Sequence, residues 1–160
     1  MAKTSNLIHK ASRADAIYVA ENLQEADKQE LDGLGHFDHE QAVVMSVLTS
    51  DNPITFWNPD GMICGVAGVS RTDAHCGAIW MLTTDHVRHY PKLFFKEAKK
   101  WVNAQTDYDL LYNIADPRNL LHMKLLHMLG FKRLSYVSVG PKNLTFVEFA
   151  KLPCASQQPL

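Results

Sequence analysis

The segment ADPRNLLHMKLLHMLGFKRL, from Ala115 to Leu134, constrains the fold more than any other stretch of the chain. Asp116 offers a helix N-cap oxygen, Pro117 suits the first helical position, and Gly130 is a typical helix stop. A buried-strand pattern, YDLLYNIA, comes just before, and the strand pattern FKRLSYVSV begins at its end. The sequence therefore predicts a strand, a capped helix and a second strand in close succession.

The rest of the chain shows further strand and helix patterns. Leu7 to Ala11 suits a short first strand, and two or three helices follow it in DAIYVAENL, EADKQELDGLG and DHEQAVVMSVLTSD. Two β-rich runs flank the turn sequence NPDG at 58–61, which predicts a hairpin. A strand over Gly77 to Thr84, a helix over Pro91 to Gln105 and a last strand pair complete the order. This order predicts an α+β fold with helices on both faces of a sheet.

Length and composition favour a single folded domain. The chain has 160 residues, of which 46% are hydrophobic and 21% charged, so we expect one domain over residues 1–152 and a flexible polar tail over 153–160. The net charge of −1 gives no strong signal for nucleic-acid binding. Three cysteines without CxxC spacing indicate a reducing compartment, and no apolar run suggests a signal peptide or membrane span. We therefore expect a cytoplasmic location where the protein is made.

The eight histidines do not form a recognisable metal motif. His122 and His127 are five residues apart, which separates them by about 140° around a helix. The pairs at 36/39 and 86/89 have no cysteine or glutamate at ligand spacing. We expect no metal site from these patterns.

The element order, together with NLLHMKLLHMLGF from Asn119 to Phe131, resembles the GNAT acyltransferase superfamily. The resemblance extends from about Leu7 to Lys151. It implies a mixed, mostly antiparallel central sheet of about six or seven strands, with acyl-coenzyme A as cosubstrate in a cleft where the fourth and fifth strands splay apart. The segments ENLQEADKQEL, WMLTTD and LYNIADPRNLLHMKLLHMLGF are also similar to acyltransferase-like internal virion proteins of short-tailed phages.

The resemblance also implies a site for the coenzyme A pyrophosphate on a turn that precedes a helix. The positions that correspond here are Arg88, Pro91 and Leu93. Pro91 has no N–H to donate and Leu93 adds bulk where glycine or alanine is usual, so charge on Arg88 and Lys92 would have to hold the phosphates. Backbone groups of the fourth strand would polarise the thioester carbonyl. The implied cofactor-binding residues are Leu82, Thr83, Thr84, Arg88, Lys92 and Asn119.

A general acid for the departing thiolate is missing from its usual place. In the superfamily it is often a tyrosine seven residues after the helix-opening asparagine, which corresponds here to Leu126. Leucine carries no proton. Other candidates are Tyr90, Tyr112 and Tyr136, and no spacing singles one out.

Polar residues near the fourth and fifth strands are candidates for the remaining chemistry. Asp85, at the end of WMLTTD, could act as a base or could simply be a solvated strand end. Asn113 lies within a buried strand pattern and serves either structural hydrogen bonding or ligand contact. The catalytic candidates are Asp85, Asn113 and Asn119.

The sequence leaves three functions open. The first is an acyl-coenzyme A dependent N-acyltransferase acting on an amine acceptor. The second is a GNAT fold that has lost catalysis and serves as a phage protein, packaged in the virion or bound to a host protein; the changes at Pro91, Leu93 and Leu126 favour it. The third is a binding module for another small ligand. Whether the chain is an enzyme stays open on the sequence alone.

Overall fold

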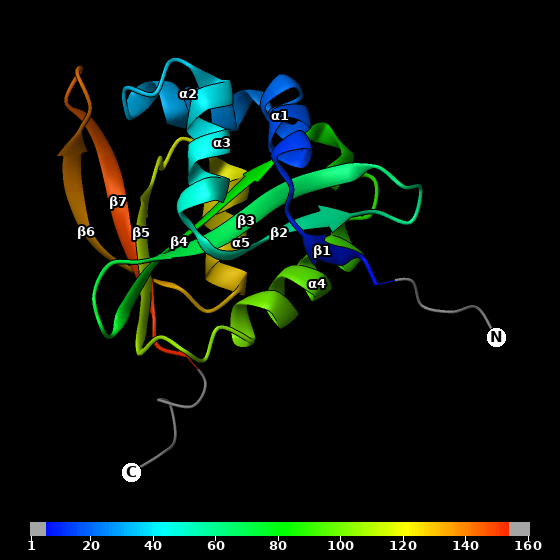
Figure 1. Ribbon diagram of the computed structural model, residues 1–160. Coiled ribbons are helices and arrows are strands. Elements are labelled where there is room, and N and C mark those ends of the chain that lie inside the picture. The colour runs from blue at the N-terminus through cyan, green and yellow to red at the C-terminus, as the bar shows by residue number, and fades with distance from the viewer. Residues whose placement is uncertain (1–5, 154–160) are drawn as a thin grey trace, which may run out of the picture.

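A computed structural model describes residues 6–153 of the chain. The predicted tail lies outside this range except for Pro153. The described residues form a seven-stranded sheet in the order β1-β2-β3-β4-β5-β7-β6 (Figure 1). Its strands are β1 Ile8–Lys10, β2 Asp51–Trp57, β3 Ile63–Arg71, β4 Cys76–Thr83, β5 Leu110–Ala115, β6 Lys132–Val139 and β7 Leu144–Lys151. All neighbouring pairs in this part of the chain are antiparallel except β4 and β5, which confirms the predicted mostly antiparallel α+β sheet.

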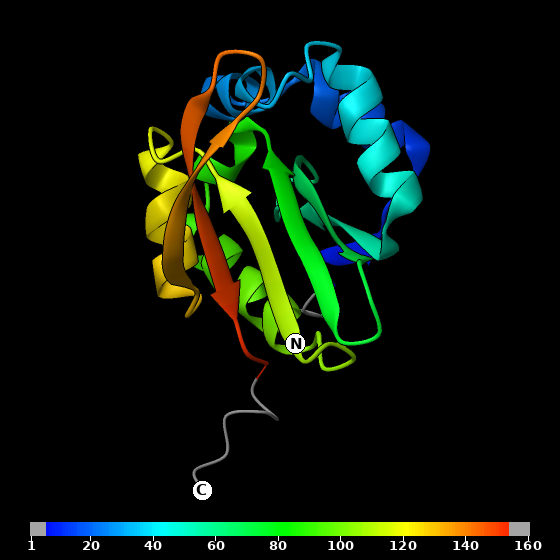
Figure 2. The same ribbon diagram turned by 90° about the vertical axis from the view of Figure 1, so that its left-hand side faces the viewer.

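Helices cover both faces of the sheet, as the sequence predicts. The helices are α1 Arg13–Glu21, α2 Glu25–Gly33, α3 His39–Thr49, α4 Pro91–Asn103 and α5 Leu120–Met128, with a 3₁₀ turn, η1, at Asp85–Arg88. On one face, α1 and α3 bury Val19 and Val43 against Val66 of β3. On the other, Trp101 of α4 and Met123 of α5 belong to a second apolar core. Figure 2 shows α3 and α5 on opposite sides of the sheet.

The parallel pair β4 and β5 separates along its length. Its register joins Cys76 with Leu110 and ends where Ala78 meets Tyr112. Beyond that point β4 stays paired with β3 and β5 with β7, so the sheet remains one body but opens between the two strands (Figure 2). An opening of this kind exposes backbone groups that need other partners.

The start of α5 differs from the sequence prediction. The N-cap is Asn119, whose side chain accepts a hydrogen bond from the His122 N–H, and the helix begins at Leu120. The Asp116 carboxylate does not cap this helix because it is buried and binds Arg118, with 2.6 Å between Oδ2 and Nη2. Gly130 follows the helix at a φ of +91°, as expected for a helix stop.

A break between α1 and α2 positions the second helix at the opening of the sheet. Leu23, in the break, forms an isolated antiparallel bridge with Thr84, just past the end of β4. At its other end α2 is fixed by the turn between β6 and β7, because Gly140 lies directly against the carbonyl oxygen of Gly33. The described part of the chain, residues 6–153, contains no helix with the length and apolar character to cross a membrane.

Replacing Gly140 by alanine should destabilise the protein more than the same change at Gly61. Both glycines have positive φ, +71° and +76°, a conformation that costs an alanine about 1–2 kcal/mol. A Cβ at Gly140 would also collide with the Gly33 carbonyl, whereas a Cβ at Gly61 meets no atom within 4 Å. The free energies of unfolding of G140A and G61A, measured by chemical denaturation, test this; equal losses would contradict the described packing of the β6–β7 turn on α2.

Candidate functional site

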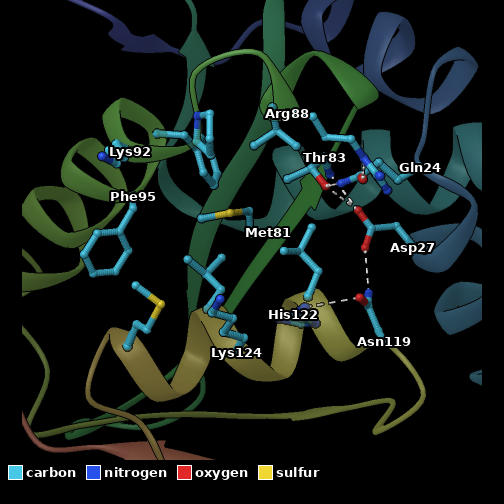
Figure 3. A pocket seen from close by; sticks show the side chains of 16 residues that line it. Gln24, Asp27, Met81, Thr83, Arg88, Lys92, Phe95, Asn119, His122 and Lys124 are labelled. Atoms are coloured by element: carbon cyan, nitrogen blue, oxygen red, sulfur yellow. Dashed lines mark hydrogen bonds between the residues drawn. The ribbon is translucent and has the colours of Figure 1, made fainter.

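A pocket of about 650 Å³ lies beside the end of β4, beyond the point at which β4 separates from β5 (Figure 3). Four parts of the chain form it: α2 and the residue before it, the end of β4, the segment from η1 into α4, and α5. Its lining residues are Gln24, Asp27, Met81, Thr83, Val87, Arg88, Pro91, Lys92, Phe94, Phe95, Asn119, Leu121, His122, Lys124, Leu125 and Met128.

The pocket combines apolar walls with cationic groups. The apolar side chains come from all sides except α2 and include Met81, Phe95 and Leu125. Three cationic side chains also line it: Arg88, Lys92 and Lys124. Figure 3 shows Arg88 near Gln24 and Asp27, with Lys92 and Phe95 on the other side. Such a surface suits an elongated ligand with a largely apolar arm and anionic groups.

A hydrogen-bonded network centred on α2 lies at the polar end of the pocket. Asp27 Oδ2 accepts hydrogen bonds from the backbone N–H of Thr83 (2.9 Å) and from its hydroxyl (2.7 Å). Asp27 Oδ1 accepts one from the Asn119 amide, 3.1 Å away, as the dashed line in Figure 3 shows. Asp27 therefore connects the end of β4 with the start of α5 across the opening.

Glu30, one turn further along α2, binds the same part of α5. Its Oε2 lies 3.2 Å from Nδ1 of His122 and 3.4 Å from the Asn119 amide nitrogen. Its Oε1 accepts a hydrogen bond from the Asp116 N–H at 3.2 Å. Because a carboxylate only accepts, the His122 Nδ1 carries the proton in this contact. The Asp27 and Glu30 residues are only 7% and 8% exposed, so their hydrogen bonds replace lost hydration.

Burial and charge shift the protonation of two members of this network. Burial raises the pKa of Asp27, although hydrogen bonds from Thr83 and the nearby His122 oppose the shift. For His122, burial acts to lower the pKa, but the hydrogen bond and charge of Glu30, with the charge of Asp27, raise it above its ordinary value. The site therefore favours a protonated imidazole beside two acidic side chains.

Four of the residues that the resemblance implies lie on this pocket: Thr83, Arg88, Lys92 and Asn119. Arg88 also donates from Nε to Gln24 Oε1 at 3.2 Å. Their binding roles stay predictions, but the structure brings them together around one space.

Leu82 and Thr84 do not line the pocket. Leu82 packs against the core under α1 and α3, on the other face of the sheet. Thr84 is buried, and its hydroxyl donates to the Ile63 carbonyl at 2.7 Å. The backbone N–H of Thr84 donates to Cys64, and that of Thr83 donates to Asp27. A carbonyl could use the Thr83 N–H only if Asp27 released it.

Asp85 and Asn113 also lie away from the pocket lining. The Asp85 side chain is 78% exposed in η1, 3.8 Å from Arg88. The Asn113 amide donates to the Ile79 carbonyl at 2.8 Å and so joins β5 to β4 where they separate. A structural role thus accounts for the observed contacts of Asn113, whereas catalytic roles for both residues stay untested predictions.

Sequence reasoning missed Gln24, Asp27, Glu30 and His122. The segment EADKQELDG has the composition of a solvated helix, and its mostly polar pattern gave no reason to bury Asp27 and Glu30. Their i, i+3 spacing, which places both on one helix face, was the available signal. In the sequence, His122 is considered with His127 as a possible metal ligand, yet its hydrogen-bond partner is Glu30 of a different helix, α2.

Comparisons with known proteins find a fold but no sequence family. No family model matches the chain, and no curated protein matches it. Among solved structures, a Vibrio cholerae spermidine N-acetyltransferase in complex with CoA and spermine superposes with a TM-score of 0.68 and 8% identity, over 94% of this chain and 97% of that one.

Two further solved structures show the same likeness. A phosphinothricin acetyltransferase of the GNAT superfamily from Sinorhizobium meliloti, in complex with AcCoA, gives a TM-score of 0.63 at 15% identity over 96% of this chain and 92% of that one. A GNAT-family acetyltransferase from Streptococcus pneumoniae gives 0.57 at 19% identity over 92% and 98%. The chain thus has the GNAT fold, as the sequence resemblance implied.

Substituting His122 should cost more stability in acid than in alkaline solution. A pKa that is raised in the folded state means that protonation of His122 stabilises the protein below about pH 6.5. This contribution disappears as the pH rises through the folded-state pKa. The difference in free energy of unfolding between wild type and H122Q should therefore be larger near pH 6 than near pH 9, as measured by denaturant titration. A difference that is equal or larger at the higher pH would contradict the described Glu30–His122 pair.

Proposed function

We propose that the protein is an acyl-coenzyme A dependent N-acyltransferase. The observation that carries this proposal is the pocket at the separation of β4 and β5 in a GNAT fold, with apolar walls and the cationic side chains of Arg88, Lys92 and Lys124. Two solved structures of similar fold hold CoA or AcCoA. Their presence supports the choice of a thioester of coenzyme A as ligand.

The pocket offers separate surroundings for the two ends of coenzyme A. The pantetheine arm would lie along Met81, Phe95 and Leu125, which exclude water from it. The pyrophosphate would lie between Arg88 and Lys92, which come from opposite sides of the pocket (Figure 3). Pro91, the first residue of α4, removes one of the backbone donors that a helix start usually gives to phosphate. Side-chain charge would therefore contribute more of the phosphate binding than backbone N–H groups.

The acceptor would be a small cationic amine that approaches from α2. Asp27 lines the polar end of the pocket, and Glu30 is bonded to the lining residues Asn119 and His122. The negative charge of these two carboxylates would attract an ammonium group. After its ammonium group has released a proton to water, the neutral amine would attack the carbonyl carbon of the thioester, forming the C–N bond while the C–S bond breaks. The spermine in the Vibrio cholerae structure supports the choice of polyamines as first probes.

A second candidate is a GNAT-fold protein without catalysis, such as a phage virion or host-interaction protein. The observation in its favour is that the Thr83 and Thr84 N–H groups already have protein acceptors, so no free donor awaits a carbonyl there. Pro91, Leu93 and Leu126 also depart from the superfamily pattern. Copurification with virions or a host protein, together with absence of coenzyme A binding, would support this candidate instead.

Removing two cationic groups should weaken binding of acetyl-coenzyme A. The double variant R88A/K92A should lose at least about tenfold in affinity, because charge-assisted hydrogen bonds to phosphate are lost. K99A is the matched control, since Lys99 is exposed on α4 and does not line the pocket. Isothermal titration calorimetry of both variants and wild type measures this. Equal affinity in all three would contradict the assigned phosphate position, and no binding by wild type would contradict the proposed function.

Incubation with acetyl-coenzyme A and spermidine should release free coenzyme A thiol. The expected result is thiol formation that needs both substrates and saturates with each. A thiol reagent measures the product, and mass spectrometry detects the acetylated amine. Binding of acetyl-coenzyme A without thiol release for spermidine or other primary amines would favour the catalytically inactive alternative.

A further inference from the structure

We propose that His122, held by Glu30, is the proton donor to the departing thiolate. This inference rests on the proposed function, because it assigns a step of that reaction. The position that usually carries the acid corresponds to Leu126, which does not line the pocket. His122 lies one helical turn earlier on nearly the same face of α5 and does line it.

The other candidate acids are elsewhere. Tyr90 donates its hydroxyl to Asp60 at 3.0 Å, on the exposed surface. Tyr136 is 68% exposed on β6, and neither it nor Tyr112 lines the pocket. Among the residues that line it, His122 is the side chain whose ordinary pKa is nearest to neutrality. It is therefore the best placed group to give and regain a proton during turnover.

The contacts of His122 leave one ring nitrogen available to a ligand. Nδ1 donates to Glu30, whereas Nε2 has no hydrogen-bond partner among residues 6–153. Among residues 6–153, the one fully buried side-chain nitrogen or oxygen that lacks a partner is Asn58 Nδ2. Nε2 of His122 also lacks a partner and is therefore not fully buried, which leaves it accessible to a ligand. The ring also contacts Phe149 edge to face, with 6.3 Å between centroids. Glu30 and Phe149 thus fix the orientation of the imidazole.

The charges around His122 suit a proton donor. From α2, Glu30 and Asp27 face it, and both favour the imidazolium form. At the N-cap of its own helix, Asn119 joins the network as a neutral amide, and Lys124 of the helix lines the same pocket. The negative charge of Asp116 is paired with the guanidinium group of Arg118. Glu30 therefore holds Nδ1, and Nε2 has no partner among residues 6–153 in a side chain that lines the pocket.

The step balances in protons and electrons. The amine nitrogen attacks the carbonyl carbon and the C–N bond forms. As the C–S bond breaks, the sulfur takes the bonding pair and accepts the Nε2 proton of the imidazolium. The neutral imidazole then accepts the proton that the new amide nitrogen loses. One N–H proton has moved to sulfur through His122, and Glu30 is a positioning residue that keeps Nδ1 protonated.

The test compares H122Q with H127Q, the same change at an exposed histidine of the same helix. Turnover of acetyl-coenzyme A with spermidine is followed by thiol release, and acetyl-coenzyme A affinity by calorimetry. We expect H122Q to lose about 100-fold or more in kcat with little change in affinity, and H127Q to behave as wild type. Full turnover by H122Q would overturn the inference alone, whereas absence of thiol release in wild type would overturn it together with the proposed function.

The pH profile separates proton donation from a structural role. In wild type, kcat should fall as the pH rises through the pKa of His122, which nuclear magnetic resonance of the imidazole measures directly. In E30Q, which keeps a hydrogen-bond acceptor but removes the charge, both the pKa and this alkaline limb should move to lower pH together. If the alkaline fall of kcat stays at the same pH in E30Q while the pKa of His122 moves, the inference is overturned. This test does not depend on H122Q being able to fold.

Discussion

The bonds that Asp27 forms across the opening between β4 and β5 are the constraint on which the site depends. A sheet that opens in this way leaves backbone donors at the end of β4, and a buried donor without a partner costs about 1–3 kcal/mol. Asp27 satisfies the Thr83 N–H and hydroxyl, and its other oxygen binds Asn119 at the start of α5. The same carboxylate thus joins one strand and one helix that would otherwise be separate walls of the pocket.

This arrangement explains why the pocket has two chemically different ends. The network from α2 concentrates buried carboxyl groups and one histidine at the polar end, while the remainder is largely apolar, with residues such as Phe95 and Met128 beside the cationic Lys92 and Lys124. Burial of Asp27 raises its pKa, and the two carboxyl groups together raise that of His122. The arm of a bound thioester would contact apolar side chains, and the titratable His122 would lie near its carbonyl group and sulfur. Under the proposed function, a substrate carbonyl would compete with Asp27 for the Thr83 N–H, and this competition would couple binding to catalysis.

Local signals made much of the fold predictable. The NPDG turn, the helix pattern of Pro91 to Gln105 and the helix stop at Gly130 are local in sequence. The helices and strands appear close to where such patterns place them, apart from the start of α5. The site was less predictable, because it is made by contacts between segments far apart in sequence. In the sequence, Asp27 and Glu30 have the pattern of solvated residues, and only the packing of α2 against α5 buries them. Asp116 has the pattern of a helix cap, but its carboxylate binds Arg118 and its N–H donates to Glu30. A polar helix is therefore a poor guide to burial when it lies over an opening in a sheet.

A crystal structure with coenzyme A bound tests the central claim most directly. The account predicts density for the pantetheine arm between β4 and α5, with the pyrophosphate near Arg88 and Lys92 and the sulfur facing His122. Coenzyme A bound on another surface, or an empty pocket in crystals grown with saturating coenzyme A, would contradict it.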